Sequence, residues 1–292
     1  MHEGSFVTSS PFSGKTLFLV QVNDVILSTG NPKVKELVKL RQSSRRRREL
    51  GLFVVEGAIE ISVLLQADKK ICEIYFCEDL PRHGETWEFL ESCQEDGCEL
   101  REMGTDAFGK ASYKSGSRAP LAVFETWDLS ISRLQQSPRV ALVLDEVEKP
   151  GNLGAILRTA EAFGVSSVLL SDPALDFFNP NVVRSSRGLM AGLDIASGNK
   201  EEVFSWLAKE GLRLIGTSAK SSSSYWNLDF VSGTVFVLGS EKAGLGQFWR
   251  ERIDEWITIP MEGEASSLNL NVSAACLLAE FNRSVRSELK GS

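Results

Sequence analysis

Short apolar segments alternate with amphipathic segments through the C-terminal half of the chain, and this alternation restricts the fold more than any other feature. Apolar residues that recur every three or four positions predict a helix, and four or five in a row predict a buried strand. Strands separated by helices usually pair in parallel, because each helix carries the chain back across the sheet. We therefore predict an α/β fold, with a C-terminal parallel sheet covered by helices on both faces. The predicted strands are residues 140–144, 167–170, 214–217, 235–238 and 257–259, and the predicted helices are 154–163, 183–189, 201–210 and 272–289.

The N-terminal half repeats the alternation in a smaller α/β unit. Residues 1–22 are rich in Ser, Gly and Thr, and we expect them to form a flexible leader. Residues 129–139 are polar and aperiodic, which predicts a linker between domains at 23–128 and 140–292. In the first of these domains the predicted helices begin at Asn31-Pro32 and span 58–66 and 85–95, and the predicted strands are 52–55, 71–76 and 121–127.

The overall composition indicates an ordinary globular protein. Of the 292 residues, 42% are hydrophobic and 24% are charged, and two domains suit this length. A net charge of −7 leaves any RNA affinity to local basic patches. No apolar run approaches a membrane span, and the first residues do not resemble a signal peptide. We therefore expect a cytoplasmic protein without a membrane partner.

The five cysteines favour free thiols over a disulfide framework. Cys72 with Cys77, and Cys93 with Cys98, have spacings that the loosest zinc sites accept. The first pair lies in a predicted strand, however, where a separation of five sends the two side chains to opposite faces. We expect no metal.

Residues 142–164 join a predicted strand, through a Pro-Gly-Asn turn, to an amphipathic helix that Gly164 ends. The apolar stripe of this helix consists of Leu153, Ile156, Leu157, Ala160 and Phe163. Arg158 falls on another face, near Gly154, and is not needed for the core. The pattern alone leaves two interpretations, an arginine that serves a ligand or a solvated surface arginine.

Two later stretches also follow predicted strands. Residues 235–246 break into glycines around Ser240 and Glu241, which either allow a ligand close to the backbone or only form a connection. Residues 259–271 enter the last helix, and Ser267 and Asn269 either cap that helix or contact a ligand.

A run of four arginines, Arg45, Arg46, Arg47 and Arg48, is the most basic stretch of the chain. Such a run either binds RNA phosphates or forms a solvated face. Other basic residues that could contribute to a local patch are Lys110, Lys114 and Arg118.

Taken together, the three stretches resemble the three motifs of the SpoU family of RNA ribose 2′-O-methyltransferases, in the SPOUT class. The first motif is matched by Asn152-Leu-Gly-Ala-Ile-Leu-Arg158-Thr-Ala, the second by Leu238-Gly-Ser-Glu241 with Gly244, and the third by Ile259-Pro-Met261 through Ser267-Leu-Asn269. Upstream, Asn31-Pro32, the arginines and Phe53-Val-Val-Glu-Gly57 more loosely resemble the family's substrate-binding domain, which is related in fold to a small ribosomal RNA-binding protein.

The resemblance implies that residues 23–128 bind RNA through Arg45 to Arg48, and that residues 140–292 form a SPOUT methyltransferase domain with a deep trefoil knot. It also implies a homodimer whose site is completed across the interface. S-adenosyl-L-methionine would be the cofactor, held by Thr217, Leu238, Gly239, Ile259, Met261 and Leu268. The catalytic positions would be Arg158, Asn152, Glu241, Ser267 and Asn269.

In this family the residue that matches Arg158 is assigned as the group that activates the ribose hydroxyl. A guanidinium is a poor base, so Arg158 acts either as that base or by binding phosphate and stabilising the oxyanion. We expect Asn152 and Glu241 to orient Arg158 and the knot loops, and Ser267 and Asn269 to hold the nucleotide or the methyl donor.

Ribosomal RNA is the favoured substrate. The alternatives are a transfer RNA methyltransferase, a non-catalytic RNA-binding member of the same fold, or an unrelated nucleotide-binding enzyme. The last would require a glycine fingerprint after the first strand, which the sequence lacks.

Overall fold

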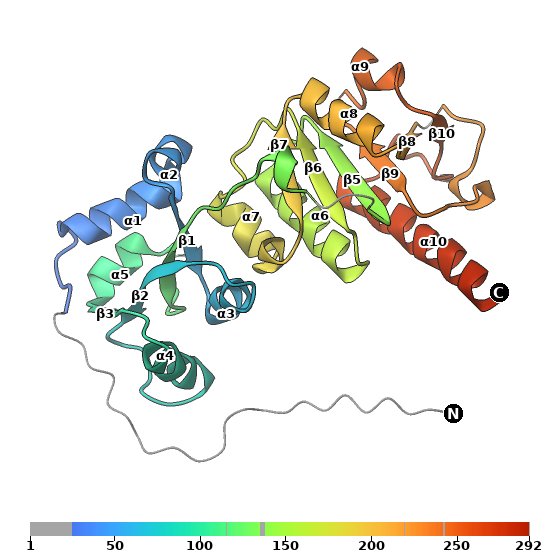
Figure 1. The fold of residues 1–292 in the computed structure, drawn as a ribbon. Helices are drawn as coiled ribbons and strands as arrows, with labels where there is room; N and C mark the ends of the chain where they lie inside the picture. The colour runs from blue at the N-terminus through green and yellow to red at the C-terminus, as the bar shows by residue number, and fades with distance from the viewer. Residues whose placement is uncertain (1–24, 115, 135–137, 219, 242, 292) are drawn as a thin grey trace.

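The computed structural model describes residues 25–114, 116–134, 138–218, 220–241 and 243–291, which form two α/β domains (Figure 1). The leader expected at residues 1–22 lies outside the described residues, as does the centre of the expected linker. Within the described ranges, no helix combines the length and the apolar character that crossing a bilayer requires.

The N-terminal domain is built on a four-stranded sheet of order β1-β4-β2-β3, in which only β2 and β3 run parallel. Its elements are α1 (Pro32–Gln42), α2 (Ser44–Leu50), β1 (Leu52–Glu56), α3 (Ala58–Gln66), β2 (Ile71–Cys77), α4 (Glu85–Glu95), β3 (Leu100–Met103), α5 (Thr105–Ala111) and β4 (Leu121–Glu125). Apolar residues of α1 and α5 pack on one face of the sheet, and those of α3 and α4 on the other.

The C-terminal domain carries a six-stranded sheet of order β10-β8-β9-β5-β6-β7, and every strand pair in it is parallel, as predicted. Its elements are β5 (Val140–Asp145), α6 (Pro150–Ala162), β6 (Ser167–Ser171), α7 (Pro180–Ser185), β7 (Ile195–Gly198), α8 (Lys200–Lys209), β8 (Arg213–Thr217), β9 (Thr234–Leu238), α9 (Gln247–Arg250), β10 (Glu255–Ile257) and α10 (Leu270–Gly291), with short 3-10 turns at Ile131–Arg133, Leu189–Ala191 and Tyr225–Asn227.

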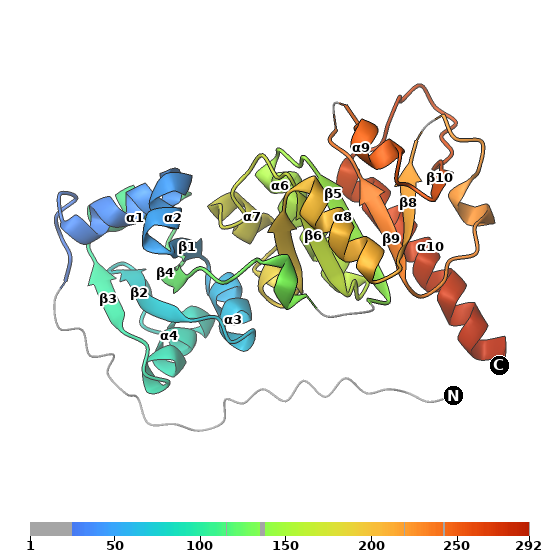
Figure 2. The ribbon, with the colours of Figure 1, turned by 45° about the horizontal axis from the view of Figure 1, so that its top comes forward.

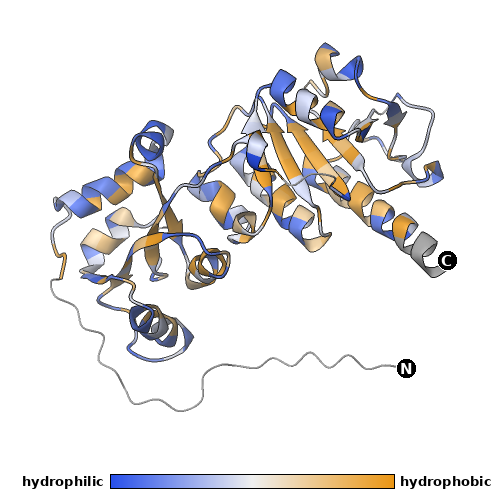
Figure 3. Ribbon diagram, in the orientation of Figure 1, coloured by the Kyte–Doolittle hydropathy of each residue, from blue (hydrophilic) through white to orange (hydrophobic). Residues whose placement is uncertain are grey.

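Helices cover both faces of this sheet, which confirms the prediction (Figure 2). Helices α6, α7 and α10 pack on the face that carries Leu142 and Leu144, and α8 and α9 pack on the face that carries Ala141 and Val143. The central strands are therefore buried on both sides, which explains their continuous apolar sequences (Figure 3).

Several predicted boundaries were wrong. The Pro-Gly-Asn sequence is not a turn but the first turn of α6, because Pro150 is well suited to the first helical position. Similarly, Pro180 begins α7 three residues before the predicted start, and Gly188, at a φ of 78°, interrupts the predicted continuation. Strand β10 ends at Ile257 rather than continuing to Ile259.

The segment expected to be a linker is partly ordered along the edge of the sheet. The backbone N–H of Ser197 in β7 donates to the carbonyl of Leu129 (2.8 Å), and the Arg133 guanidinium donates to the carbonyl of Ile195 (2.6 Å). Leu134 is buried. These contacts attach residues 129–134 to the C-terminal domain.

The two domains share one continuous apolar core, in which α7 packs against β1. Phe53 of the N-terminal domain lies 5.1 Å from the ring of Phe178 and 5.7 Å from that of Trp127. Beside this aromatic cluster, the Arg47 guanidinium pairs with the Asp176 carboxylate at 2.6 Å. The interface therefore has both an apolar centre and a buried ion pair.

Candidate active site

Parallel pairing brings the ends of β5, β8, β9 and β10 to one edge of the C-terminal sheet. Ligand sites in open α/β sheets form outside this carboxyl edge. The first, second and third sequence motifs follow β5, β9 and β10, so the fold places the start of each motif at the same edge.

The first two motifs meet at Glu241. The Asn152 amide, in the first turn of α6, donates to one Glu241 carboxylate oxygen, and the Lys149 ammonium contacts the other. Sequence reasoning selected Asn152 and Glu241 but missed Lys149, although it stands directly before Pro150 in the same motif. This group joins residues 89 positions apart in the chain.

Contacts within the chain leave room only for a glycine at position 239. A methyl group at this position would overlap the backbone of Gly244 and Leu245, because the backbone of these two residues lies directly over Gly239. The Gly244 N–H donates to the Ser240 carbonyl at 2.9 Å, and Gly244 has a φ of 65°. The glycines therefore allow neighbouring backbone segments to pack closely against each other, and not a ligand against the backbone. Likewise, Gly154 clears space for Ser185 of α7 and not for a ligand beside Arg158.

Arg158 is exposed and makes no hydrogen bond or ion pair with the described residues. It lies six residues after Asn152, which is about 9 Å along the axis of α6. The expected contact between Asn152 and Arg158 is therefore not present within one chain, where Asn152 instead contacts Glu241.

Asn269 caps the last helix. Its side-chain oxygen accepts the backbone N–H of Asn271 (2.9 Å), and its carbonyl accepts that of Ser273 (3.0 Å). The capping interpretation is confirmed for Asn269. Ser267 is exposed and forms no such bond among the described residues. Asn271, which sequence reasoning missed, accepts a hydrogen bond from the Thr159 hydroxyl (2.7 Å) and so joins α10 to α6.

A cleft of about 570 Å³ opens beside the ends of β8 and β10. Of the predicted cofactor residues, only Thr217 lines it. Leu238 is buried in the core, and Ile259, Met261 and Leu268 are partly buried on the segment between β10 and α10. The lining that sequence reasoning missed includes Ser218, Lys220, Ser221, Arg250 and Trp256.

The segments that follow the cleft residues Ser221 and Trp256 are hydrogen-bonded to each other. The backbone N–H of Thr258 donates to the Ser223 carbonyl (2.8 Å), and that of Tyr225 donates to the Thr258 carbonyl (3.0 Å). The buried Ser224 hydroxyl between them has no hydrogen-bond partner in the described part of the chain. A cleft with hydroxyl groups, an ammonium and an indole ring is suited to a polar ligand with an aromatic base.

The cysteine pairs with zinc-like spacing are the other candidate site. Cys72 is exposed on β2 and Cys77 is buried at its end. No group of three or more His, Cys, Asp or Glu side chains in the described residues is arranged to hold a metal ion.

The four arginines have different environments. Arg47 is 2% exposed and donates to Asp176 and to the Leu40 carbonyl (2.6 Å), so it has no surface to offer an RNA phosphate, and the expectation is corrected for this residue. Arg45 pairs with Glu49 and Arg46 with Glu36. Arg48 is exposed and makes no hydrogen bond or ion pair with the described residues.

The motifs agree with comparisons to known proteins. The model of the SpoU rRNA Methylase family matches residues 139–279, and that of the MRM3-like substrate binding domain matches residues 31–122. An uncharacterized tRNA/rRNA methyltransferase of Synechocystis is 30% identical over 88% of this chain and 93% of its own length. The chain belongs to the SpoU rRNA methylase family.

Two further relatives show the range of the similarity. RlmP of Bacillus subtilis, a 23S rRNA (guanosine(2553)-2′-O)-methyltransferase, is 28% identical over 87% of this chain and 97% of its own length. The AdoMet-bound crystal structure of an rRNA methyltransferase from Sinorhizobium meliloti has a TM-score of 0.79 and 26% identity, and covers 89% of this chain and 97% of its own. The similarity to this rRNA methyltransferase thus extends over both domains.

Proposed function

We propose that this protein transfers the methyl group of S-adenosylmethionine to a ribose 2′-hydroxyl of structured RNA, with ribosomal RNA as the favoured substrate. The observation that carries the proposal is the meeting of the first and second SpoU motifs, through Asn152 and Glu241, beside the cleft at the carboxyl edge of the sheet. A cytoplasmic homodimer is part of the proposal.

The cleft residues fit the methyl donor. Ser218 and Ser221 would accept or donate hydrogen bonds to the ribose, the Trp256 ring would face the adenine, and the Lys220 ammonium would attract the carboxylate of the methionine moiety. The buried Ser224 hydroxyl, which has no hydrogen-bond partner among the described residues, follows the cleft residue Ser221 by three positions and is a further donor. When bound, the donor supplies a methyl group attached to a positively charged sulfur. The backbone around Gly239, Ile259 and Leu268, with Leu238 and Met261 nearby, would complete the adenosine contacts.

The proposed knot is supported by the path of the C-terminal segment. Strand β10 lies at the edge of the sheet, where the segment after it bonds to the loop that follows β8. Helix α10, which comes next, packs on α6 behind the central strands. The chain must therefore cross from the sheet edge to the centre alongside that loop.

Arg158 would act on the hydroxyl that is methylated. A guanidinium is a poor base, so we assign Arg158 to the adjacent phosphate and to the alkoxide charge that develops as the oxygen attacks, with water accepting the proton. Because Arg158 is exposed and has no acidic partner in the described chain, this charge is available to RNA. Its distance from Asn152 fits a site in which Arg158 serves the cleft of a second chain.

Methyl transfer to RNA tests the proposal directly. Ribosomal and transfer RNA from cells that lack the gene are incubated with the protein and radiolabelled S-adenosylmethionine. Arg158→Ala should lower transfer at least about 100-fold while donor binding by calorimetry changes less than about twofold. Lys209→Ala, an exposed cation on α8, is the matched control and should not change either quantity.

Each alternative gives a different result. Methylation of transfer RNA but not of ribosomal RNA would show that transfer RNA is the substrate. RNA binding without donor binding would identify a non-catalytic member, and full turnover by Arg158→Ala would remove Arg158 from the chemistry.

A further inference from the structure

A second cavity, of about 290 Å³, lies where the two domains meet. Its polar lining comes from Glu56 at the end of β1, Glu60 on α3, Tyr113 and Lys114 after α5, and Arg184 on α7. It shares no lining residue with the cleft beside β8, nor with a smaller pocket that Lys149, Asn152 and Glu241 line. Its volume is close to the lower end of the range for small-molecule sites, about 300 Å³, so it would hold one small planar group.

The mouth of this interdomain pocket presents an aromatic ring and a guanidinium. Tyr113 is 42% exposed, and the guanidinium carbon of Arg184 lies 5.8 Å from the centre of its ring. Aromatic rings and arginine planes are the surfaces on which proteins stack unpaired RNA bases. The two groups come from different domains, so their spacing depends on the docking of α7 against β1.

The loop that carries Tyr113 is held in place. The Tyr113 backbone N–H donates to the Glu56 carboxylate (2.6 Å), and the Arg41 guanidinium donates to the carbonyls of Lys110 (3.3 Å) and Ala111 (3.0 Å) at the end of α5. The backbone that carries the exposed ring is therefore anchored by hydrogen bonds to Glu56 and Arg41. Such support is what a stacking surface requires, because a ring that is already ordered loses little entropy when a base binds.

Glu60 supplies an acceptor inside the pocket. Its carboxylate folds back against Gly57, where a methyl group would overlap it, and so lies at the N-terminus of α3. Neither carboxylate oxygen has a hydrogen-bond partner in the described part of the chain. A free carboxylate can accept two neighbouring N–H groups at once.

Among the four RNA bases, only guanine presents two adjacent N–H donors on its Watson–Crick edge. We propose that the interdomain pocket binds an unpaired guanine of the RNA substrate, with its ring on Tyr113 and its Watson–Crick edge on Glu60. Lys114 and Arg184 contact the flanking phosphates. The inference rests on the proposed function, because that function identifies the ligand as RNA. The pocket recognises a guanine that belongs to a different nucleotide from the one whose ribose is methylated.

Mononucleotides test the base preference without any methyl transfer. Calorimetric titration of the full chain with GMP, IMP and UMP should give the tightest binding for GMP. IMP lacks the exocyclic amine and should bind about fivefold more weakly, and UMP more weakly again. Glu60→Gln should reduce GMP binding about tenfold and abolish the difference between GMP and IMP. Glu85→Gln, an exposed acid in the first turn of α4, is the matched control and should leave the order unchanged.

Transfer kinetics test whether RNA uses the pocket. Tyr113→Ala should raise the KM for RNA about tenfold with kcat within twofold, whereas Tyr113→Phe, which keeps the stacking surface, should resemble the wild type. Thermal unfolding of each variant checks that the fold is retained.

The outcomes separate this inference from the proposed function. If the wild type methylates RNA and both Tyr113→Ala and Glu60→Gln keep its KM, the pocket assignment fails and the methyltransferase assignment stands. If GMP binds but the KM for RNA is unchanged in both variants, the pocket is a site for free nucleotides, and the pocket assignment is again overturned. If no RNA is methylated, the proposed function fails, and equal binding of GMP and UMP would then reject the pocket as well.

Discussion

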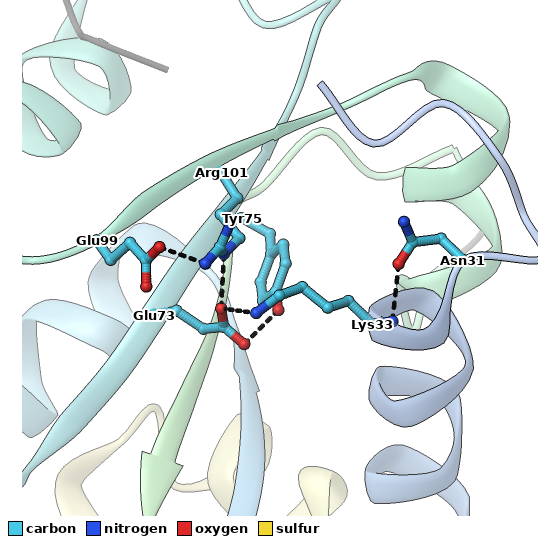
Figure 4. Close-up of polar contacts among 6 residues, drawn as sticks. All are labelled: Asn31, Lys33, Glu73, Tyr75, Glu99 and Arg101. Atoms are coloured by element: carbon cyan, nitrogen blue, oxygen red, sulfur yellow. Dashed lines mark hydrogen bonds and ion pairs between the residues drawn. The ribbon is translucent and has the colours of Figure 1, made fainter. Parts of the chain in front are cut away.

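Glu73 illustrates how much one partly buried carboxylate can contribute to the fold. It accepts hydrogen bonds from the Lys33 ammonium of α1 (2.5 Å), from the Arg101 guanidinium of β3 (2.8 Å) and from the Tyr75 hydroxyl (Figure 4). Burial alone would raise the pKa of Glu73, but the bonds from Lys33, Tyr75 and Arg101 outweigh it, so the pKa lies below the ordinary value. The ionised form is thus favoured by folding.

Glu73→Gln should lower the free energy of unfolding by about 2 kcal/mol at pH 7, because it removes a charged acceptor from three donors. A lowered pKa in the folded state means that the stabilisation is present above the unfolded pKa and is lost as the pH falls through the folded one. The difference between variant and wild type should therefore shrink below about pH 4 in urea titrations. Glu99→Gln, whose side chain is 56% exposed and pairs with Arg101, should cost less than about 1 kcal/mol. An equal effect of both variants, independent of pH, would contradict this account.

The central strands β5, β6 and β9 of the C-terminal sheet could be predicted because each is an almost continuous apolar run. Strand β6 is buried at every position, whereas the missed edge strand β7 has only two buried residues. Helix α5 was missed because it is short and contains Gly109. The glycines after β9 predicted a turn, but not that Gly239 is covered by its own loop, because that contact depends on a conformation that no residue type specifies.

Gly239→Ala should displace the loop between β9 and α9, because the added methyl group would meet backbone atoms that cannot move away alone. We expect a loss of about 2 kcal/mol in the free energy of unfolding and weaker binding of S-adenosylmethionine. Gly246→Ala is the matched control in the same loop, since its φ is −70° and a methyl group there meets nothing within 4 Å. Urea titration and calorimetry of the two variants make the comparison. Identical behaviour would show that the loop has room at both positions.

Contacts between distant segments were the least predictable part of the molecule. The meeting of Asn152 and Glu241 was expected only because the motifs resemble a family, and the single chain does not bring Arg158 to them. The run at residues 45–48 reads as uniformly basic, yet Arg47 is buried against Asp176, 129 positions away. Composition and periodicity contain no information on such a pair, because it depends on how the two domains pack.

The Arg47–Asp176 pair therefore provides a test of how the domains are joined. Arg47→Met should lower the free energy of unfolding by about 3 kcal/mol, since it leaves the Asp176 carboxylate buried without its partner. Adding Asp176→Leu to that variant should recover part of the loss. Arg48→Met is the matched control: it should change stability by less than about 0.5 kcal/mol, while weakening RNA binding at low salt.

Because the apolar core is continuous across the domains, wild-type unfolding should be one transition by fluorescence and by circular dichroism. Two separate transitions in the wild type, or equal stability of Arg47→Met and Arg48→Met, would show that the buried pair does not join the domains energetically.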